Sequence, residues 1–161
     1  MGPVETKAGE DGPTLRAARA SDLSAVELLL RTAHLPTAGV AEAFTTFVVA
    51  EHRAEIVGVA GLELRGNNAL LRSVAVASAW QNHGLGRELV ERSIALAESH
   101  KLRAVYLLTT TAERYFPAFG FEPTDRQSVP IDVRESPEFT GACPASALAM
   151  VRFIDGSNRV G

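Results

Sequence analysis

Apolar and polar positions alternate along this chain with two periods, which predict strands and amphipathic helices in turn. Residues 70–76 (Leu-Leu-Arg-Ser-Val-Ala-Val) form a short, mostly apolar run that is typical of a buried strand. The helix predicted next, at 85–97, has apolar side chains at near-helical spacing: Leu85, Leu89, Val90, Ile94 and Ala97. Upstream, residues 46–51 and 55–64 predict a β-hairpin that turns at 52–54.

The residues before and after this region predict further helices and strands, which together indicate an α/β domain. Ser21 is a suitable helix N-cap. The helix after it has an apolar face made of Leu23, Val26, Leu29, Leu30 and Ala33. Further strands are expected at 14–18, 104–110, 119–124 and 146–154, and short helices at 40–44 and near 112–118. The sum is an α/β fold with a mixed, mostly antiparallel sheet of about seven strands, flanked by about four helices.

Length and composition indicate one domain. A chain of 161 residues suits a single domain, which we place at residues 14–154. Residues 1–13 contain two Gly-Pro pairs, several charges and little apolar content, so we expect a disordered leader there. Residues 155–161 are expected to form a loose C-terminal tail.

Charge and hydropathy exclude several functional classes. The net charge of −3 and a pI of about 5.8 argue against a nucleic-acid partner. No apolar run approaches the length of a membrane span, and the N-terminus lacks a signal-peptide pattern, so we expect a cytoplasmic protein with no membrane partner. One cysteine allows no intramolecular disulfide, and the histidines show no paired spacing for a metal site.

The most informative motif is the segment Gln-Asn-His-Gly-Leu-Gly at 81–86, between the predicted strand and the long helix. A helix N-terminus exposes backbone N–H groups and the positive end of the helix dipole, and glycines let a phosphate approach them closely. The dinucleotide fingerprint does not fit, because Leu89 occupies its third small position, and the Gly-Lys-Ser/Thr of the Walker loop is absent. The motif therefore predicts an anion site, most simply for a pyrophosphate.

Together with a second motif, this loop resembles the acetyl-CoA loop of the GNAT superfamily of N-acetyltransferases. Residues 115–121 (Tyr-Phe-Pro-Ala-Phe-Gly-Phe), about thirty residues on, resemble the family's helix-to-strand segment that ends in Gly-Phe. The resemblance covers residues 14–154 and implies the GNAT fold, with acetyl-CoA as co-substrate. It also implies that the pantetheine arm pairs with the strand before the loop, and that this strand and the one containing Tyr106 splay apart. The residues expected around CoA are Val74, Val76, Gln81, Asn82, His83, Gly84, Leu85, Gly86, Arg87 and Phe116.

Three further stretches narrow the resemblance. Residues 70–76, 106–110, and 138–139 with 143–147 are similar to the GNAT proteins of bacterial arsenic-resistance operons. Those proteins are in turn similar to amino-acid N-acetyltransferases of the N-acetylglutamate-synthase type. The resemblance implies a small amino acid-like acceptor, which in an arsenic-resistance setting extends to arsenic- or phosphorus-containing amino acid analogues.

The residues at the family's usual acid and base positions differ here. Phe116 stands where a tyrosine usually protonates the leaving thiolate, and the neighbouring Tyr115 is either that acid or a packed aromatic. Arg72 stands where many members have a glutamate, and an arginine cannot accept a proton. Glu63, on the preceding strand, is the nearest replacement base, but one residue of register slip would reverse its face. Water relayed to a backbone carbonyl is the alternative base.

Arg72 instead indicates an acceptor with an acidic group, because a guanidinium binds a carboxylate with its planar fork. The alternative is an arginine paired with a core or rim carboxylate. Thr109 and Cys143 are the other residues expected at the acceptor site. Each also has a simpler interpretation, as a strand threonine and a buried small side chain.

These observations predict an acetyl-CoA-dependent N-acetyltransferase that acts on the amine of a small amino acid-like acceptor. A non-catalytic acetyl-CoA-binding sensor is the alternative, which the missing tyrosine and glutamate favour. Acetylation of protein N-termini or lysines is weaker, because a carboxylate-binding arginine has no evident role there. The last strand and the loop before it often make subunit contacts in this superfamily, so the resemblance also raises the expectation of a homodimer.

Overall fold

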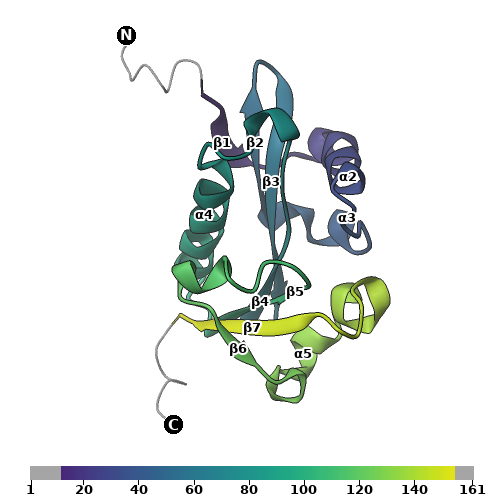
Figure 1. The fold of residues 1–161 in the computed structure, drawn as a ribbon, viewed down its shortest axis with the longest axis vertical. Coiled ribbons are helices and arrows are strands. Elements are labelled where there is room, and N and C mark those ends of the chain that lie inside the picture. Colours follow the sequence, from purple (N-terminus) through teal and green to yellow (C-terminus); the bar gives the residue numbers. More distant parts are fainter. Residues whose placement is uncertain (1–11, 155–161) are drawn as a thin grey trace.

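The computed structural model describes residues 12–154, which form a seven-stranded sheet in the order β1-β2-β3-β4-β5-β7-β6 (Figure 1). The strands are β1 Thr14–Ala17, β2 Phe47–His52, β3 Glu55–Arg65, β4 Asn68–Val76, β5 Ala104–Thr109, β6 Glu122–Thr124 and β7 Leu148–Phe153. Among the paired strands of residues 12–154, only β4–β5 is parallel, which confirms the mixed, mostly antiparallel sheet. The leader predicted at 1–13, except its last two residues, and the tail predicted at 155–161 lie outside the described residues.

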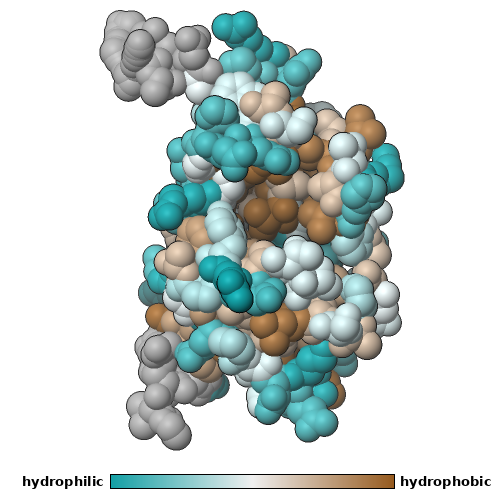
Figure 2. Space-filling view, in the orientation of Figure 1, coloured by the Kyte–Doolittle hydropathy of each residue, from teal (hydrophilic) through white to brown (hydrophobic). Residues whose placement is uncertain are grey.

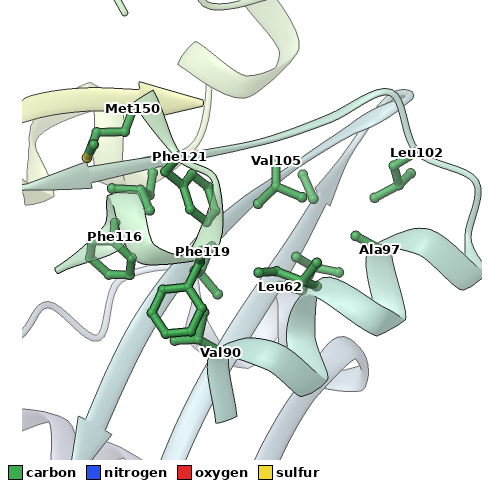
Figure 3. Packing of buried hydrophobic residues seen from close by; sticks show 13 residues of the cluster. Leu62, Val90, Ala97, Leu102, Val105, Phe116, Phe119, Phe121 and Met150 are labelled. Atoms are coloured by element: carbon green, nitrogen blue, oxygen red, sulfur yellow. The ribbon is translucent and has the colours of Figure 1, made fainter. Parts of the chain in front are cut away.

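Helices cover both faces of the sheet. They are α2 Leu23–Thr32, α3 Val40–Ala43, α4 Leu85–Ser99 and α5 Ile131–Arg134. Helix α4 lies against one face, and α2 and α3 lie on the other (Figure 1). Figure 3 shows the core on the α4 side, which includes Leu62, Val90, Val105, Phe116, Phe121 and Met150. On the α2 side, Val26 and Leu30 pack with β2 and β3 residues such as Val49 and Val59.

The predicted β2–β3 hairpin closes with a two-residue turn. Arg53 and Ala54 both have positive φ, 51° and 68°, as a type I′ turn requires. The closing pair of the hairpin is His52 with Glu55. This turn type matches the twist of the two strands, so it sets the hairpin register without a glycine.

Two helix predictions need correction. Ser21 lies inside a 3-10 turn at Ala20–Asp22, and Asp22 rather than Ser21 is the N-cap of α2. The Asp22 side chain makes no capping hydrogen bond to α2. Its carboxylate accepts a hydrogen bond from the Arg19 backbone N–H at 2.7 Å and so closes the 3-10 turn before the helix.

The helix expected near 112–118 is a single 3-10 turn at Phe116–Phe119, which Gly120 ends with φ 87°. The strand expected at 119–124 is correspondingly short, because the chain leaves this turn only at Phe121 and β6 spans three residues.

Strand β4 has an irregularity that shapes the site. Ser73 has φ 60°, and the β3–β4 register shifts there, from Arg72 opposite Gly61 to Ala75 opposite Val59. A β-bulge of this kind bends the strand and redirects its side chains. Pairing between β4 and β5 ends with Leu70 opposite Tyr106, although both strands continue beyond that point. The two strands therefore splay apart as the resemblance implied.

Candidate active site

A cavity of about 720 Å³ opens where β4 and β5 stop pairing. Its walls are residues 71–74 of β4, residues 107–112 at the end of β5, and part of the loop before β7. Figure 2 shows hydrophobic residues gathered in a hollow in the middle of this face of the molecule, between α4 and α2. Six of the residues predicted from the sequence line the cavity: Arg72, Val74, Thr109, Tyr115, Phe116 and Cys143.

The predicted anion loop lies at the N-terminus of α4. Gly84 is the N-cap with φ 85°, and Asn82 also has a positive φ of 68°. The first backbone bond of the helix runs from the Glu88 N–H to the Gly84 carbonyl at 3.1 Å. The N–H groups of residues 85–87 therefore precede the helical bonding pattern. A Cβ at Gly84 would meet no atom within 4 Å, so the backbone conformation and not lack of space favours glycine there. This arrangement fits a pyrophosphate.

Of the polar side chains of this loop and the first turn of α4, Gln81 contacts β4, whereas His83 and Arg87 lie at the surface. Gln81 donates a hydrogen bond from Nε2 to the Val76 carbonyl at 2.9 Å, which ties the loop to the end of β4. His83 is exposed. The Arg87 guanidinium is also at the surface, 3.7 Å from Glu91 and 5.8 Å from the centre of the Phe119 ring.

Tyr115 and Phe116 lie where the cavity approaches α4. Phe116 is buried among aromatic core residues, whereas Tyr115 remains 42 % exposed. A Cβ built on Gly86 would lie 3.5 Å from the Tyr115 hydroxyl, so this hydroxyl lies beside the first turn of α4. Partial burial raises the pKa of Tyr115 above its ordinary value of 10.0. The phenol therefore stays protonated at neutral pH and can donate a proton or hydrogen bond.

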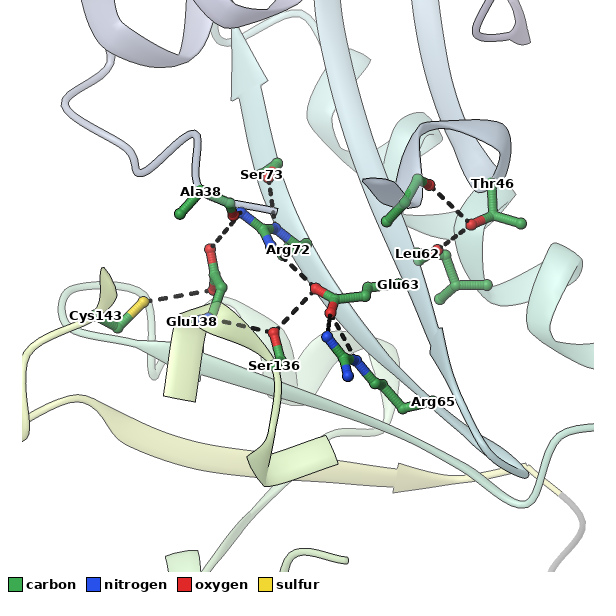
Figure 4. Close-up of polar contacts among 11 residues, drawn as sticks. Ala38, Thr46, Leu62, Glu63, Arg65, Arg72, Ser73, Ser136, Glu138 and Cys143 are labelled. Atoms are coloured by element: carbon green, nitrogen blue, oxygen red, sulfur yellow. Dashed lines mark hydrogen bonds and ion pairs between the residues drawn. The ribbon is translucent and has the colours of Figure 1, made fainter. Parts of the chain in front are cut away.

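Arg72 is the centre of a buried polar network (Figure 4). Its side chain is fully buried, and Nη1 donates to Glu63 Oε1 at 3.0 Å. Nη2 donates to the Ala38 carbonyl at 2.6 Å, and Nε donates to Ser73 Oγ at 3.1 Å. Nη2 also lies 3.4 Å from Glu138 Oε2. Arg72 is thus paired with carboxylates of this chain and at the same time lines the cavity.

Glu63 shares a sheet face with Arg72 but does not line the 720 Å³ cavity. Its Oε1 accepts hydrogen bonds from Arg72 and from Ser136 Oγ, each at 3.0 Å. Its Oε2 accepts from Nε of Arg65 at 2.7 Å. The Glu63 side chain instead borders a second cavity of about 420 Å³. Both carboxylate oxygens are therefore held by donors, away from the splayed strands.

Glu138 is an acidic group in the cavity that the sequence did not assign to the site. It is 5 % exposed, and Oε1 accepts a hydrogen bond from the Cys143 thiol at 3.4 Å. Its backbone N–H donates to Ser136 Oγ at 3.2 Å. Burial raises the pKa of Glu138 above its ordinary 4.5, while the charge of Arg72 opposes that rise. Burial and the nearby Glu138 raise the pKa of Cys143 to about 12, so its thiol is protonated.

The structure thus brings Arg72, Tyr115 and Cys143 to one cavity and separates Glu63 from it. Sequence reasoning missed Glu138 and Ser136 because both lie in an irregular loop before β7, where no periodicity indicates a face. The only sequence feature that pointed to Glu138 was the pair Glu138–Phe139, which is one of the stretches similar to arsenic-resistance GNAT proteins and had no assigned role in the site.

Among residues 12–154, no helix is long and apolar enough to cross a membrane.

Comparisons with known proteins agree with this geometry. A family model described as "Acetyltransferase (GNAT) domain" matches residues 43–123. An amino-acid acetyltransferase of Mycobacterium tuberculosis is 30 % identical over 155 residues, which cover 89 % of this chain and 84 % of that protein.

Two solved structures are similar in fold. The M. tuberculosis protein Rv2747, in complex with CoA and a second ligand, superimposes with a TM-score of 0.71 at 26 % identity, covering 88 % of this chain and 99 % of that one. The N-acetylglutamate synthase of Neisseria gonorrhoeae, complexed with coenzyme A and N-acetyl-glutamate, gives a TM-score of 0.76 at 19 % identity. That match covers 95 % of this chain but 37 % of the longer synthase, and it shows a shared fold.

Proposed function

Because this chain belongs to the GNAT family of N-acetyltransferases, we propose that it transfers an acetyl group from acetyl-CoA to the amine of a small amino acid-like acceptor. The observation that carries this proposal is the 720 Å³ cavity between β4 and β5, which has a buried Arg72–Glu138 ion pair in its wall. Charges of both signs suit an acceptor that itself has an ammonium and an acidic group. The amino-acid acetyltransferase among the relatives supports the same class of acceptor.

The CoA-binding part of the proposal depends on the loop at 81–86 and on β4. Acetyl-CoA supplies the activated acetyl thioester. The N–H groups of residues 85–87 bind the pyrophosphate, with Arg87 near enough at the surface to add a charge. The backbone of Val74 and Val76 pairs with the pantetheine arm, along the edge of β4 that β5 leaves open.

The Ser73 bulge suggests which group polarises the thioester carbonyl. Val74 follows the bulge and has no register partner on β3. It also lines the cavity. We therefore assign the Val74 N–H as the donor to the carbonyl oxygen, a role that needs no side chain. Tyr115, whose hydroxyl lies beside the first turn of α4, is the proposed proton donor to the departing sulfur.

Arg72 is proposed to bind the acidic group of the acceptor. Glu63, fixed by Arg65 and Ser136, holds the guanidinium in place and does not act as the base. Thr109 and Cys143 are proposed to line the acceptor end of the cavity. The protonated Cys143 thiol is a small wall residue there and not a nucleophile.

The narrower proposal concerns arsenic- or phosphorus-containing amino acid analogues. Its support is the resemblance of residues 70–76, 106–110, and 138–139 with 143–147 to arsenic-resistance GNAT proteins. An arsinic or phosphinic group is anionic and hydrogen-bonds to a guanidinium much as a carboxylate does. The amino-acid acetyltransferase among the relatives has a name that refers to ordinary amino acids, so the acceptor panel must separate the two classes.

The test is acetyl-CoA-dependent release of free thiol at pH 7–8.5. The acceptor panel contains glutamate, glutamine, arsinic and phosphinic analogues of glutamate, the carboxyl-blocked form of each amino acid, and a lysine peptide. Turnover that requires a free acidic group supports the proposal, and the preferred anion identifies the acceptor class. Binding of acetyl-CoA without turnover of any acceptor would refute it and favour a sensor.

A further inference from the structure

Glu138 is a buried carboxylate in the cavity wall to which the proposed function gives a charge but no chemical step. It comes from the loop before β7, whereas Arg72 comes from β4, so the fold brings the two together over a long separation in sequence (Figure 4). Its side chain lies between the guanidinium of Arg72 and the thiol of Cys143. Every one of these groups lines the 720 Å³ cavity.

The contacts of Arg72 create a constraint on acceptor binding. Nε and Nη1 donate to Ser73 and Glu63, and Nη2 donates to the Ala38 carbonyl. An acceptor carboxylate can therefore pair with Nη2 only if a resident partner gives way. Glu63 is the less movable of the two carboxylates, because Arg65 and Ser136 hold it as well.

Glu138 is the partner of Arg72 that an acceptor carboxylate can displace from Nη2. Its contact with Nη2 of Arg72 is 3.4 Å, longer than the 3.0 Å hydrogen bond between Arg72 and Glu63. No other cation is paired with its carboxylate among the contacts of the described residues. A carboxylate displaced from its only cation inside a buried site must be neutralised, because an unpaired buried charge is costly.

We propose that Glu138 and the acceptor exchange partners: the acceptor's acidic group replaces Glu138 at Nη2 of Arg72, and Glu138 takes a proton from the acceptor's ammonium group. This inference rests on the proposed function and supplies its missing base. Glu138 is thus a catalytic residue, and Arg72 holds Glu138 in the cavity wall until the acceptor takes its place.

The exchange balances in charge and in protons. Before it, the site contains Glu138 as an anion, Arg72 as a cation and a zwitterionic acceptor. After it, Glu138 is neutral, Arg72 is paired with the acceptor's anion, and the nitrogen has a free electron pair. That pair forms the bond to the acetyl carbon, and the bond from this carbon to the CoA sulfur breaks. The sulfur leaves with the proton of the Tyr115 hydroxyl, and the second proton of the nitrogen restores that hydroxyl. The proton on Glu138 returns to solvent.

The surroundings of Glu138 suit this role. Burial raises its pKa above the ordinary 4.5, and the negative charge of Glu63 raises it further. The other charged or titratable groups facing this region are Arg72 on β4, Cys143 and Arg126 around the loop, and His34 after α2. Displacement from Arg72 removes the main opposing charge, so the proton affinity of Glu138 increases at the moment when the ammonium arrives.

The experiment is a pH–rate profile, from pH 6 to 10, of Glu138→Gln with the best acceptor of the panel. The variant should lose about 100-fold in kcat at pH 7, within the range for removal of a general base. Its rate should then rise about tenfold per pH unit until the acceptor amine loses its own proton, which for a free amino acid occurs above the value of about 8 for a peptide α-amine. Because glutamine releases Arg72 from one counter-ion, the KM for the acceptor should stay unchanged or fall.

The control variants separate catalysis from structure. Glu135→Gln removes an exposed carboxylate on the same loop and should retain the wild-type profile. Glu138→Asp keeps the acid one methylene further away and should retain the shape of the wild-type profile at about a tenth of its rate. If Glu138→Gln does not fold, as judged by circular dichroism and acetyl-CoA binding, the kcat of Glu138→Asp decides: a loss of about tenfold at unchanged KM supports the inference, and a wild-type kcat overturns it.

Several results would overturn the inference. One is a Glu138→Gln profile parallel to that of the wild type, and another is a raised KM with unchanged kcat. A third is loss of the pH plateau in His34→Gln, because His34 lines the same cavity and its imidazole would then be the proton acceptor. Absence of wild-type turnover would instead refute the proposed function, so the two failures are distinguishable.

Discussion

Replacement of Arg72 by methionine tests the buried network most directly. Methionine keeps most of the volume of the arginine stem but removes the guanidinium. In the structure that group donates three hydrogen bonds, to Glu63, Ser73 and Ala38, and forms a second ion pair with Glu138. Its side chain is fully buried, so water does not replace the lost donors.

The size of the effect follows from the two carboxylates left behind. Removing one partner of a buried ion pair costs about 3–5 kcal/mol, because the other charge stays buried without compensation. Domains of this size have free energies of unfolding of about 5–15 kcal/mol, so the variant should still fold but lose a large part of that free energy. With about 2–4 °C lost per kcal/mol, the melting temperature should fall by roughly 6–20 °C.

The assay is urea unfolding followed by circular dichroism at several pH values. Arg87→Met is the matched control, since Arg87 is exposed and its Glu91 partner lies 3.7 Å away. That surface pair should contribute less than about 0.5 kcal/mol. A loss below about 1 kcal/mol for Arg72→Met at pH 7 would refute the reasoning.

The pH dependence gives a second check. The folded-state pKa of Glu138 already exceeds its ordinary 4.5, and removal of Arg72 takes away the main charge that lowers it. A carboxyl with a raised pKa contributes stability that is complete below pH 4.5 and is lost as pH rises through its folded-state value. The difference between wild type and Arg72→Met should therefore be smallest near pH 4.5 and grow toward pH 8. A difference that shrinks as pH rises would contradict the assigned charges.

Three further predictions concern the cavity and the loop. Gly84→Ala should destabilise the fold by about 1–2 kcal/mol and raise the KM for acetyl-CoA, because its φ of 85° is unfavourable for alanine; urea unfolding and initial rates measure both. Tyr115→Phe should lower kcat at pH 7–8 and change the free energy of unfolding by no more than about 0.5 kcal/mol. The wild-type rate should show no decline from tyrosine ionisation below pH 10.0, because the pKa of Tyr115 is raised. Cys143 should react with iodoacetamide at least 100-fold more slowly in the native protein than in urea at pH 8, because its pKa is raised to about 12; equal rates would contradict the burial of the thiol.

Local features of the site were predictable from the sequence. The step from an apolar strand through two glycines into a helix is contained in residues 70–97, and the structure places the N-terminus of α4 at the predicted residue, Leu85. The apolar face of α4 is also as predicted, with Leu85, Leu89, Val90, Ile94 and Ala97 buried. These features depend on neighbouring residues, so composition and periodicity carry enough information to predict them.

The face of Glu63 was not predictable, because one residue of slip exchanges the two faces of a strand. The register that decides it, Gly61 opposite Arg72 and Glu63 opposite Leu70, places Glu63 beside the guanidinium. The bulge at Ser73 is equally invisible in the sequence, since serine rarely adopts a φ of 60° and nothing nearby requires it.

By itself, the sequence determined the fold class and the glycine turn from β4 into α4, because both follow from short-range patterns of apolar residues and glycines. The family followed from the resemblance of the motifs at 81–86 and 115–121. The tertiary structure alone decided that Arg72 is already paired with Glu63 and that Glu138 stands in the cavity. Glu138 lies in a loop before β7 and reaches β4 only through the packing of the C-terminal segment. Contacts between residues so far apart along the chain depend on register, bulges and loop paths, whose energies are set by the whole fold and not by any local pattern.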